Sequence, residues 1–163
     1  MKKLILICMV ILSAFCFADN IEKNLILEFG RGHIGEYDDC YNNNPSMVGI
    51  ELKKNDNSII LFNMINSQYR DSQGLIYNHY ININKSKFSL ILGTGIITGY
   101  SNKALVQNSK ELEGWTYPVP STLICEGVAL DIHLGLEYKV NNDISISGAL
   151  FGNCLDLILK IKL

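Results

Sequence analysis

The sequence lacks several features that would place it in common protein classes. After residue 18, no apolar run reaches the roughly 18 residues that a membrane-spanning helix needs. Only three prolines occur among 163 residues, and the formal net charge is −2 with no block of basic residues. A chain without a basic patch lacks the electrostatic footprint of a nucleic-acid-binding protein. These absences argue against a helical membrane protein and against nucleic acid as a partner.

Cysteine is scarce and shows no motif spacing. Of five cysteines, Cys40, Cys125 and Cys154 lie after residue 18. In an oxidising compartment three cysteines allow one disulfide and one leftover thiol, and a Cys125–Cys154 pair competes with pairing to Cys40. No Cys-x-x-Cys or His-x-x-x-His spacing is present, so the sequence predicts neither a metal site nor a cofactor.

The first 18 residues have the pattern of an export signal. Two lysines begin the segment, an apolar stretch follows, and Cys16-Phe17-Ala18 offers small residues at −3 and −1, so we expect cleavage before Asp19. A lipoprotein anchor at Cys16 is the alternative, which the bulky residue before it disfavours. The remainder, residues 19–163, suits a single domain.

Alternation of apolar and polar side chains with a period of two dominates residues 19–163, and this pattern predicts β-strands. In the last segment every second residue from 155 to 163 is Leu or Ile, whereas Asp156, Lys160 and Lys162 lie on the other face. We expect the strand at 122–138 to be interrupted near Glu126-Gly127. The eight expected strands are 25–33, 47–52, 59–69, 75–84, 88–99, 122–138, 144–151 and 155–163.

The connections between these strands alternate in length. Residues 53–57, 85–86 and 141–143 form short polar turns, whereas 34–46 and 101–116 are long and join the other ends of the strands. Long loops on one rim and short turns on the other are typical of outer-membrane barrels. The sequence therefore predicts an all-β fold, a closed eight-stranded antiparallel up-and-down transmembrane β-barrel in the cell outer membrane. Both termini are expected on the short-turn rim.

Alternation alone leaves open a soluble periplasmic barrel of the lipocalin kind, which hides apolar residues inside and shows polar ones outside. A membrane barrel has the opposite arrangement, with large apolar residues facing lipid and small or polar residues lining the bore. It also predicts an aromatic girdle at the outer interface, made by Tyr100, Trp115 and Tyr117. We expect such a protein to be a monomer whose partners are membrane lipids and the outer-membrane insertion machinery.

Three short stretches, in order along the chain, carry a family resemblance. The first is Tyr41-Asn42-Asn43-Asn44-Pro45 with Gly49-Ile50-Glu51, the second is Asn66-Ser67-Gln68-Tyr69, and the third runs from Gly93-Thr94-Gly95 through Thr98-Gly99-Tyr100 to Tyr117-Pro118-Val119-Pro120. They resemble, in the same order, three parts of the lipid A palmitoyltransferase (PagP-type) family. The first stretch is similar to that family's first outer loop and second strand, and the second stretch to its third strand. The third stretch is similar to its glycine-rich fifth strand and its proline-bearing sixth strand.

The resemblance implies an outer-membrane barrel that moves a palmitoyl chain from a phospholipid to lipid A, with the acyl chain inside the barrel. It makes substrate-binding candidates of Tyr41, Gly93, Gly95, Pro118 and Pro120. Sideways access beside the prolines is physically reasonable, because proline lacks the N–H that a ladder hydrogen bond needs.

The family's candidate catalytic groups are a histidine in the first outer loop and an Asp-Ser pair on the third strand. Ser67 matches the serine, Asn66 stands where the aspartate would be, and His33 is the nearest histidine. His33 would take the Ser67 proton, and Asn66 could donate a hydrogen bond to a developing oxyanion. Neighbouring strand residues point to opposite faces, so Asn66 and Ser67 share a face only if a bulge intervenes.

The residues alone leave other functions open. If His33 and Ser67 are ordinary polar residues of the rim, the protein is a non-catalytic small outer-membrane barrel with a structural or surface-modifying role. A soluble periplasmic lipid-binding barrel is the second alternative. His79 alternates with apolar residues and is expected at the interface or in the bore, and mid-strand His133 is expected to be structural.

Overall fold

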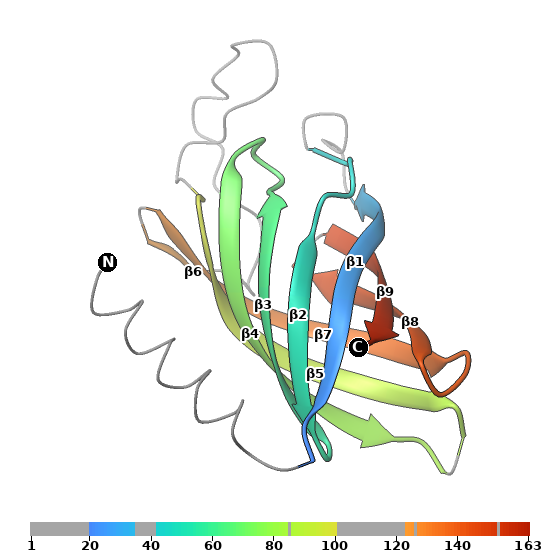
Figure 1. Cartoon of the computed structure of the whole chain (residues 1–163). Helices are drawn as coiled ribbons and strands as arrows, with labels where there is room; N and C mark the ends of the chain where they lie inside the picture. Colours follow the sequence, from blue (N-terminus) through green and yellow to red (C-terminus); the bar gives the residue numbers. More distant parts are fainter. Residues whose placement is uncertain (1–19, 35–41, 85, 101–122, 126, 153) are drawn as a thin grey trace.

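The computed structural model describes residues 20–34, 42–84, 86–100, 123–125, 127–152 and 154–163 (Figure 1). Every regular element in these ranges is a strand. None of the described segments is a helix of the length and hydropathy that crossing a bilayer requires. The strands are β1 (Glu22–His33), β2 (Val48–Lys54), β3 (Asn57–Ile65), β4 (Asp71–Asn82), β5 (Phe88–Thr98), β6 (Leu123–Cys125), β7 (Val128–Lys139), β8 (Ile144–Phe151) and β9 (Cys154–Lys162).

Eight of these strands form a closed antiparallel barrel, which confirms the predicted fold class. Neighbouring strands follow the order β5-β4-β3-β2-β1-β9-β8-β7, and pairing of β5 with β7 closes the ring. This closing ladder runs from Phe88 opposite Tyr138 to Thr98 opposite Val128. The short β6 pairs with the first residues of β7, so the predicted interruption is confirmed, and Gly127 makes the turn with a φ of +84°.

The short turns and the termini share one end of the barrel, as expected. Asn55 and Asp56 alone separate β2 from β3, and the positive φ of Asn55 suits a tight hairpin turn. At the same end the backbone N–H of Leu163 donates to the carbonyl of Lys23 over 2.8 Å. The long connections, residues 34–47 and 99–122, leave from the opposite end. The expected export signal, residues 1–18, lies outside the described residues.

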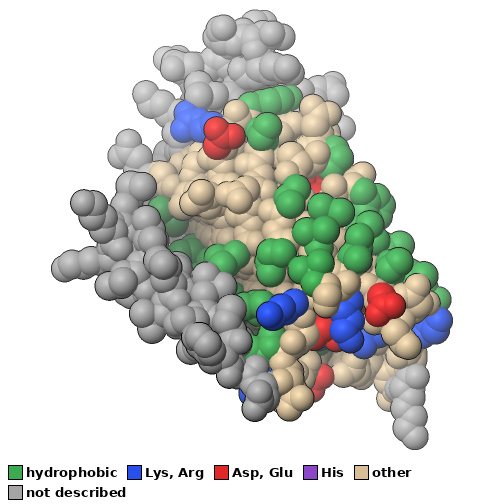
Figure 2. Space-filling model, viewed as in Figure 1, with side chains coloured by type: hydrophobic (Ala, Val, Ile, Leu, Met, Phe, Trp, Pro, Cys, Tyr) green, Lys and Arg blue, Asp and Glu red, His purple; other side chains and the backbone are tan. Residues whose placement is uncertain are grey.

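The outer and inner faces of the wall differ sharply in composition. On β7, Ile132 and Leu134 face outward with exposed fractions of 53% and 50%, whereas Asp131, His133 and Glu137 face inward and are buried. Figure 2 shows hydrophobic side chains between charged residues along the lower edge and a smaller charged group near the top. The prediction that large apolar residues face outward is confirmed.

The bore is not lined only by small and polar side chains, because an apolar layer fills its middle. Phe62 shows how tightly this layer packs: its register neighbours are Gly49 and Gly74, and a Cβ on Gly74 would lie 2.0 Å from the Phe62 ring. Close packing of this kind leaves no open channel. The buried members of the layer are Ile26, Met47, Ile60, Phe62, Ile76, Ile97, Tyr100, Ala129, Ala149 and Ile158.

The predicted strand at 59–69 is too long, because β3 ends at Ile65. A turn follows, organised by the side chain of Asn66, whose Oδ1 accepts the backbone N–H groups of Gln68 (2.8 Å) and Arg70 (3.1 Å). The N–H of Asn66 donates to the carbonyl of Arg70 over 2.8 Å. Asparagine competes for backbone hydrogen bonds in this way, and period-2 counting does not detect it.

Candidate functional site

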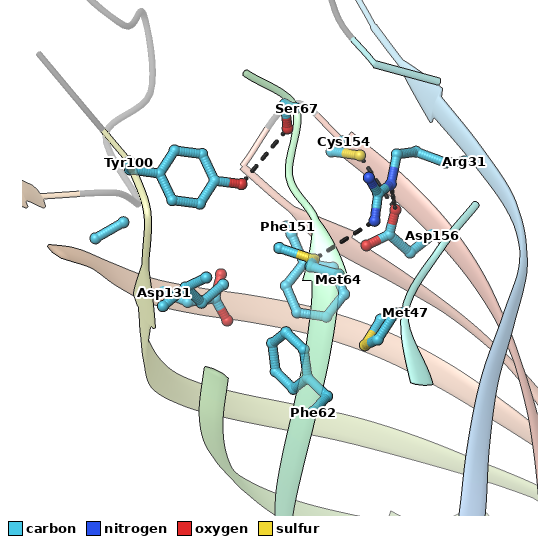
Figure 3. Close-up of a pocket in the computed structure, with 12 residues that line it drawn as sticks. Arg31, Met47, Phe62, Met64, Ser67, Tyr100, Asp131, Phe151, Cys154 and Asp156 are labelled. Carbon is cyan, nitrogen blue, oxygen red and sulfur yellow. Dashed lines mark hydrogen bonds and ion pairs between the residues drawn. The ribbon is translucent and has the colours of Figure 1, made fainter. Parts of the chain in front are cut away.

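A cavity of about 40 Å³ lies inside the barrel toward the end with the long connections (Figure 3). Its wall combines sulfur-containing and aromatic side chains with a cluster of charged groups. The lining residues are Arg31, Met47, Phe62, Met64, Ser67, Ile97, Tyr100, Ala129, Asp131, Phe151, Cys154 and Asp156. A volume of this size holds about three water molecules.

Arg31 is the centre of the charged cluster, and its side chain is only 2% exposed. Its Nε and Nη2 donate to the two carboxylate oxygens of Glu28, each over 2.8 Å. Nε also lies 3.3 Å from Asp156 Oδ1, and Nη1 donates to the backbone carbonyl of Ile65 over 2.7 Å. A fork–fork guanidinium–carboxylate pair fixes both side chains in orientation.

This cluster stands where the strand ladder between β1 and β2 stops. The β1–β2 pairing ends at Leu27 opposite Val48, whereas the β1–β9 pairing continues up to His33 opposite Cys154. Above Leu27 one backbone hydrogen bond remains, from the Glu28 N–H to the Met47 carbonyl over 2.9 Å, and the Glu28 carboxylate Oε2 accepts the backbone N–H groups of residues 46 (2.7 Å) and 47 (2.8 Å). Beyond Glu28, the described contacts between β1 and the chain before β2 are made by side chains rather than by a sheet ladder.

Ser67 and Asn66 are both buried, although strand parity predicts opposite faces for them. They share the interior because the turn after β3 replaces the alternation of a strand. Ser67 Oγ lies 3.5 Å from the Tyr100 hydroxyl oxygen, and Asn66 Nδ2 donates to Ser72 Oγ over 2.9 Å. The prediction that Tyr100 belongs to an outer aromatic girdle is therefore wrong, because this side chain points into the cavity (Figure 3).

His33 lies at the same end of the barrel as Asn66 and Ser67, as the sequence predicts. Its Nδ1 is 2.7 Å from Asn43 Oδ1, and the same oxygen accepts the His33 backbone N–H over 3.2 Å. Among the described residues, the Ser67 hydroxyl contacts Tyr100 and not His33. The expected general-base pair is thus not preformed, and its catalytic role stays a prediction.

His133 is buried and has partners that the sequence did not reveal. Its Nδ1 lies 2.6 Å from Asp131 Oδ2, and its Nε2 lies 2.9 Å from Asn78 Oδ1. The ring also packs on Phe151, with ring centroids 4.4 Å apart. The sequence signal for this pair was Asp131 and His133 two residues apart on one strand, but Asn78 is 55 positions from His133 and carried no such signal. His79, by contrast, is exposed on the outer face.

The two glycines expected to bind substrate have structural neighbours in the wall. A Cβ on Gly93 would lie 2.1 Å from the His133 ring, and a Cβ on Gly95 would lie 2.5 Å from the carbonyl oxygen of Leu75. Both glycines therefore permit close packing of the barrel wall. Three other candidates, Tyr41, Pro118 and Pro120, lie outside the described residues, as do Trp115 and Tyr117 of the expected girdle.

Cys154 is a buried free thiol that donates to Asp156 Oδ1 over 3.2 Å. The structure therefore contains no Cys125–Cys154 disulfide. Within the described ranges, no group of three or more His, Cys, Asp or Glu side chains is arranged to hold a metal ion.

A second polar cluster closes the bore at the short-turn end. Lys160 Nζ lies 2.8 Å from Glu137 Oε2, 3.4 Å from Glu51 Oε1 and 2.6 Å from the Tyr80 hydroxyl oxygen. Lys53 completes the group, with its Nζ 3.5 Å from Glu137 Oε1. The cluster joins side chains of β2, β4, β7 and β9 across the bore, so the two ammonium groups balance the two carboxylates.

No protein-family model, curated protein or solved structure matches this chain. The resemblance to lipid A palmitoyltransferases therefore stays a prediction from the three short sequence stretches.

Proposed function

We propose that this protein is an outer-membrane β-barrel that lies with its apolar wall against lipid and does not conduct through its bore. One row of side chains carries the proposal. Leu92, Leu134, Leu150 and Leu155 are register neighbours on β5, β7, β8 and β9, and each is between 40% and 50% exposed. A soluble monomer rarely exposes a contiguous apolar surface of this kind.

The inside of the barrel supports the same proposal. Barrels with a bore of this width are filled by side chains, and here ion pairs close one end while the Phe62 layer closes the middle. Charged groups are costly in lipid unless they are paired and turned inward. The Lys160 and Arg31 clusters meet both conditions.

Fractionation of cells that express the full chain tests the proposal. A membrane-embedded barrel should remain with the outer-membrane fraction after a carbonate wash, and it should migrate differently on a gel before and after boiling. Recovery in the soluble periplasmic fraction would overturn the proposal in favour of the carrier alternative.

The second candidate function is acyl transfer from a phospholipid to lipid A, which the sequence resemblance and the cavity beside Ser67 favour. Met47, Met64 and Phe151 give the cavity an apolar wall, and the β1–β2 pairing, which does not continue past Glu28, offers a sideways route from the lipid. The cavity is far smaller than a palmitoyl chain. Flexible methionine side chains are the groups best able to yield space to a chain.

In this reaction the Ser67 oxygen would attack the ester carbonyl of the donor lipid. The Ser67 O–acyl bond forms, the bond to the donor glycerol oxygen breaks, and the Ser67 proton passes to that oxygen through His33. A hydroxyl of lipid A then takes the acyl group and returns its proton to Ser67. The contact between His33 and Ser67 must form on substrate binding, because general-base catalysis needs roughly 2.6–3.2 Å or one bridging water.

Mass spectrometry of lipid A tests this candidate. Expression of the wild type should add the mass of one acyl chain, and Ser67→Ala and His33→Ala should each abolish the addition. Ser147→Ala is the matched control, because Ser147 is also a buried serine but lies on β8, away from the cavity. Unchanged lipid A with a correctly inserted wild type would reject acyl transfer and leave the non-catalytic barrel.

A further inference from the structure

All the lysines that the structure describes lie at the short-turn end of the barrel. They stand at the start of β1, the end of β2, just before β5, and at the ends of β7 and β9. The two described arginines, Arg31 and Arg70, lie at the opposite end. The seven lysines are Lys23, Lys53, Lys54, Lys87, Lys139, Lys160 and Lys162.

Four of these lysines face the bore or its mouth and three face outward. Lys160 is buried and Lys53 is half-buried, and both pair with Glu137 inside the bore. Lys139 and Lys162 line the mouth of the bore together with Glu22 and Asp143. The outward lysines, which we call the lysine rim, are Lys23, Lys54 and Lys87, and none of them forms an ion pair among the described residues.

Aromatic side chains stand next to the lysine rim on the outer surface. Phe88 and Tyr138 are register neighbours on β5 and β7, their ring centroids are 4.9 Å apart, and both are exposed. Lys87 Nζ lies 5.9 Å from the Tyr138 ring centroid and donates to the carbonyl of Val140 over 3.2 Å. Aromatic rings mark the boundary between hydrocarbon and headgroups, and lysines extend from there to the headgroups.

We propose that the lysine rim binds the phosphates of anionic phospholipids in the leaflet that surrounds the short-turn end. This inference rests on the proposed membrane embedding. Lys23 on β1 and Lys87 just before β5 lie on opposite sides of the eight-stranded ring, and Lys54 lies at the end of β2. A ring of charge matches a leaflet that surrounds the barrel, whereas a single protein or nucleic-acid partner would meet a patch on one side.

The test uses the full chain reconstituted in vesicles of phosphatidylcholine mixed with phosphatidylglycerol, followed by native mass spectrometry of the lipids that stay bound. The wild type should retain phosphatidylglycerol over phosphatidylcholine, by about fivefold for each lysine that reaches a headgroup. Added salt should reduce the preference, because it screens exposed charges.

The triple variant Lys23→Gln/Lys54→Gln/Lys87→Gln should insert normally and lose the preference. Arg70→Gln, at the other end, is the control and should keep it. Equal retention of the two lipids by the wild type, or an equal loss in the Arg70→Gln protein, would overturn the inference. A protein that fails to insert at all would instead overturn the proposed membrane embedding, so the two failures can be told apart.

Discussion

The His133 ring on β7 reaches over β5 to Asn78 on β4, and its Nε2 lies 2.9 Å from Asn78 Oδ1. The residue of β5 between them is Gly93, which is the register neighbour of both. The absence of a side chain at this position allows a hydrogen bond that spans three strands. The bore is therefore braced by contacts between side chains as well as by the backbone ladders.

Gly93→Ala should disrupt this contact. The added Cβ would lie 2.1 Å from the His133 ring and 2.3 Å from Asn78 Oδ1, so the ring must move or the strands must separate. Overpacking of this kind costs about 1–3 kcal/mol of unfolding free energy, measurable by urea titration in vesicles. Gly32→Ala is the control, because nothing lies within 4 Å of a Cβ there. Equal stability of the two variants would contradict the packing described for Gly93.

Two buried serines should respond differently to loss of the hydroxyl. Ser58 Oγ donates to Glu51 Oε1 over 2.7 Å, so Ser58→Ala should lower the unfolding free energy by about 1–3 kcal/mol. Ser147 Oγ has no hydrogen-bond partner among the described residues, so Ser147→Ala should be close to neutral. Chemical unfolding of both variants under the same conditions makes the comparison, and a larger loss for Ser147→Ala would argue against the polar cluster as described.

Lys160→Met should be among the most damaging single substitutions in the barrel. It would leave Glu51 and Glu137 buried with only Lys53 to balance them, and an uncompensated buried charge costs about 3–5 kcal/mol. Lys162→Met, two residues later and exposed, should change stability by no more than about 0.5 kcal/mol. The measurement is the midpoint of urea unfolding, and similar midpoints for the two variants would place Lys160 outside a paired cluster.

Leu134→Arg distinguishes a membrane barrel from a soluble one. Leu134 faces outward in the middle of β7, where an arginine facing lipid costs about 2–4 kcal/mol. Val128→Arg, at the end of the same strand, should cost only about 0–1 kcal/mol because the side chain reaches the interface. Folding yields into vesicles give the comparison. In a soluble barrel neither arginine would reduce folding, since both would point into water.

Planar bilayer recordings should show no steady conductance for the wild type. The Phe62 layer and the Lys160 cluster each close the bore, and the cavities beside them measure only about 40 and 20 Å³. Lys160→Met should also remain silent where it inserts, because the apolar layer is unchanged. Stable single-channel currents from the wild type would contradict the closed bore.

The number of strands, the short turns and the face of most side chains followed from the linear pattern of residues. Side-chain parity along a strand is a local property, so Leu134 outside and His133 inside could be assigned without coordinates. Parity stops at the end of a strand, however, and this is why the strand at 59–69 was predicted too long and Tyr100 was placed on the outside. The Asn66 turn follows local hydrogen bonds, and the chain beyond β5 bonds to Gly127, and alternation describes neither.

Which interior residues meet was decided only by closure of the barrel. Lys160 and Glu51 lie 109 positions apart, and Arg31 and Asp156 lie 125 apart. Parity predicts that such side chains point inward, but their height in the bore depends on the register between strands and on how the ring closes. The bore around Phe62 is likewise filled because eight strands close into a barrel of one narrow width. The local pattern therefore specifies the wall, and long-range pairing specifies what the wall encloses.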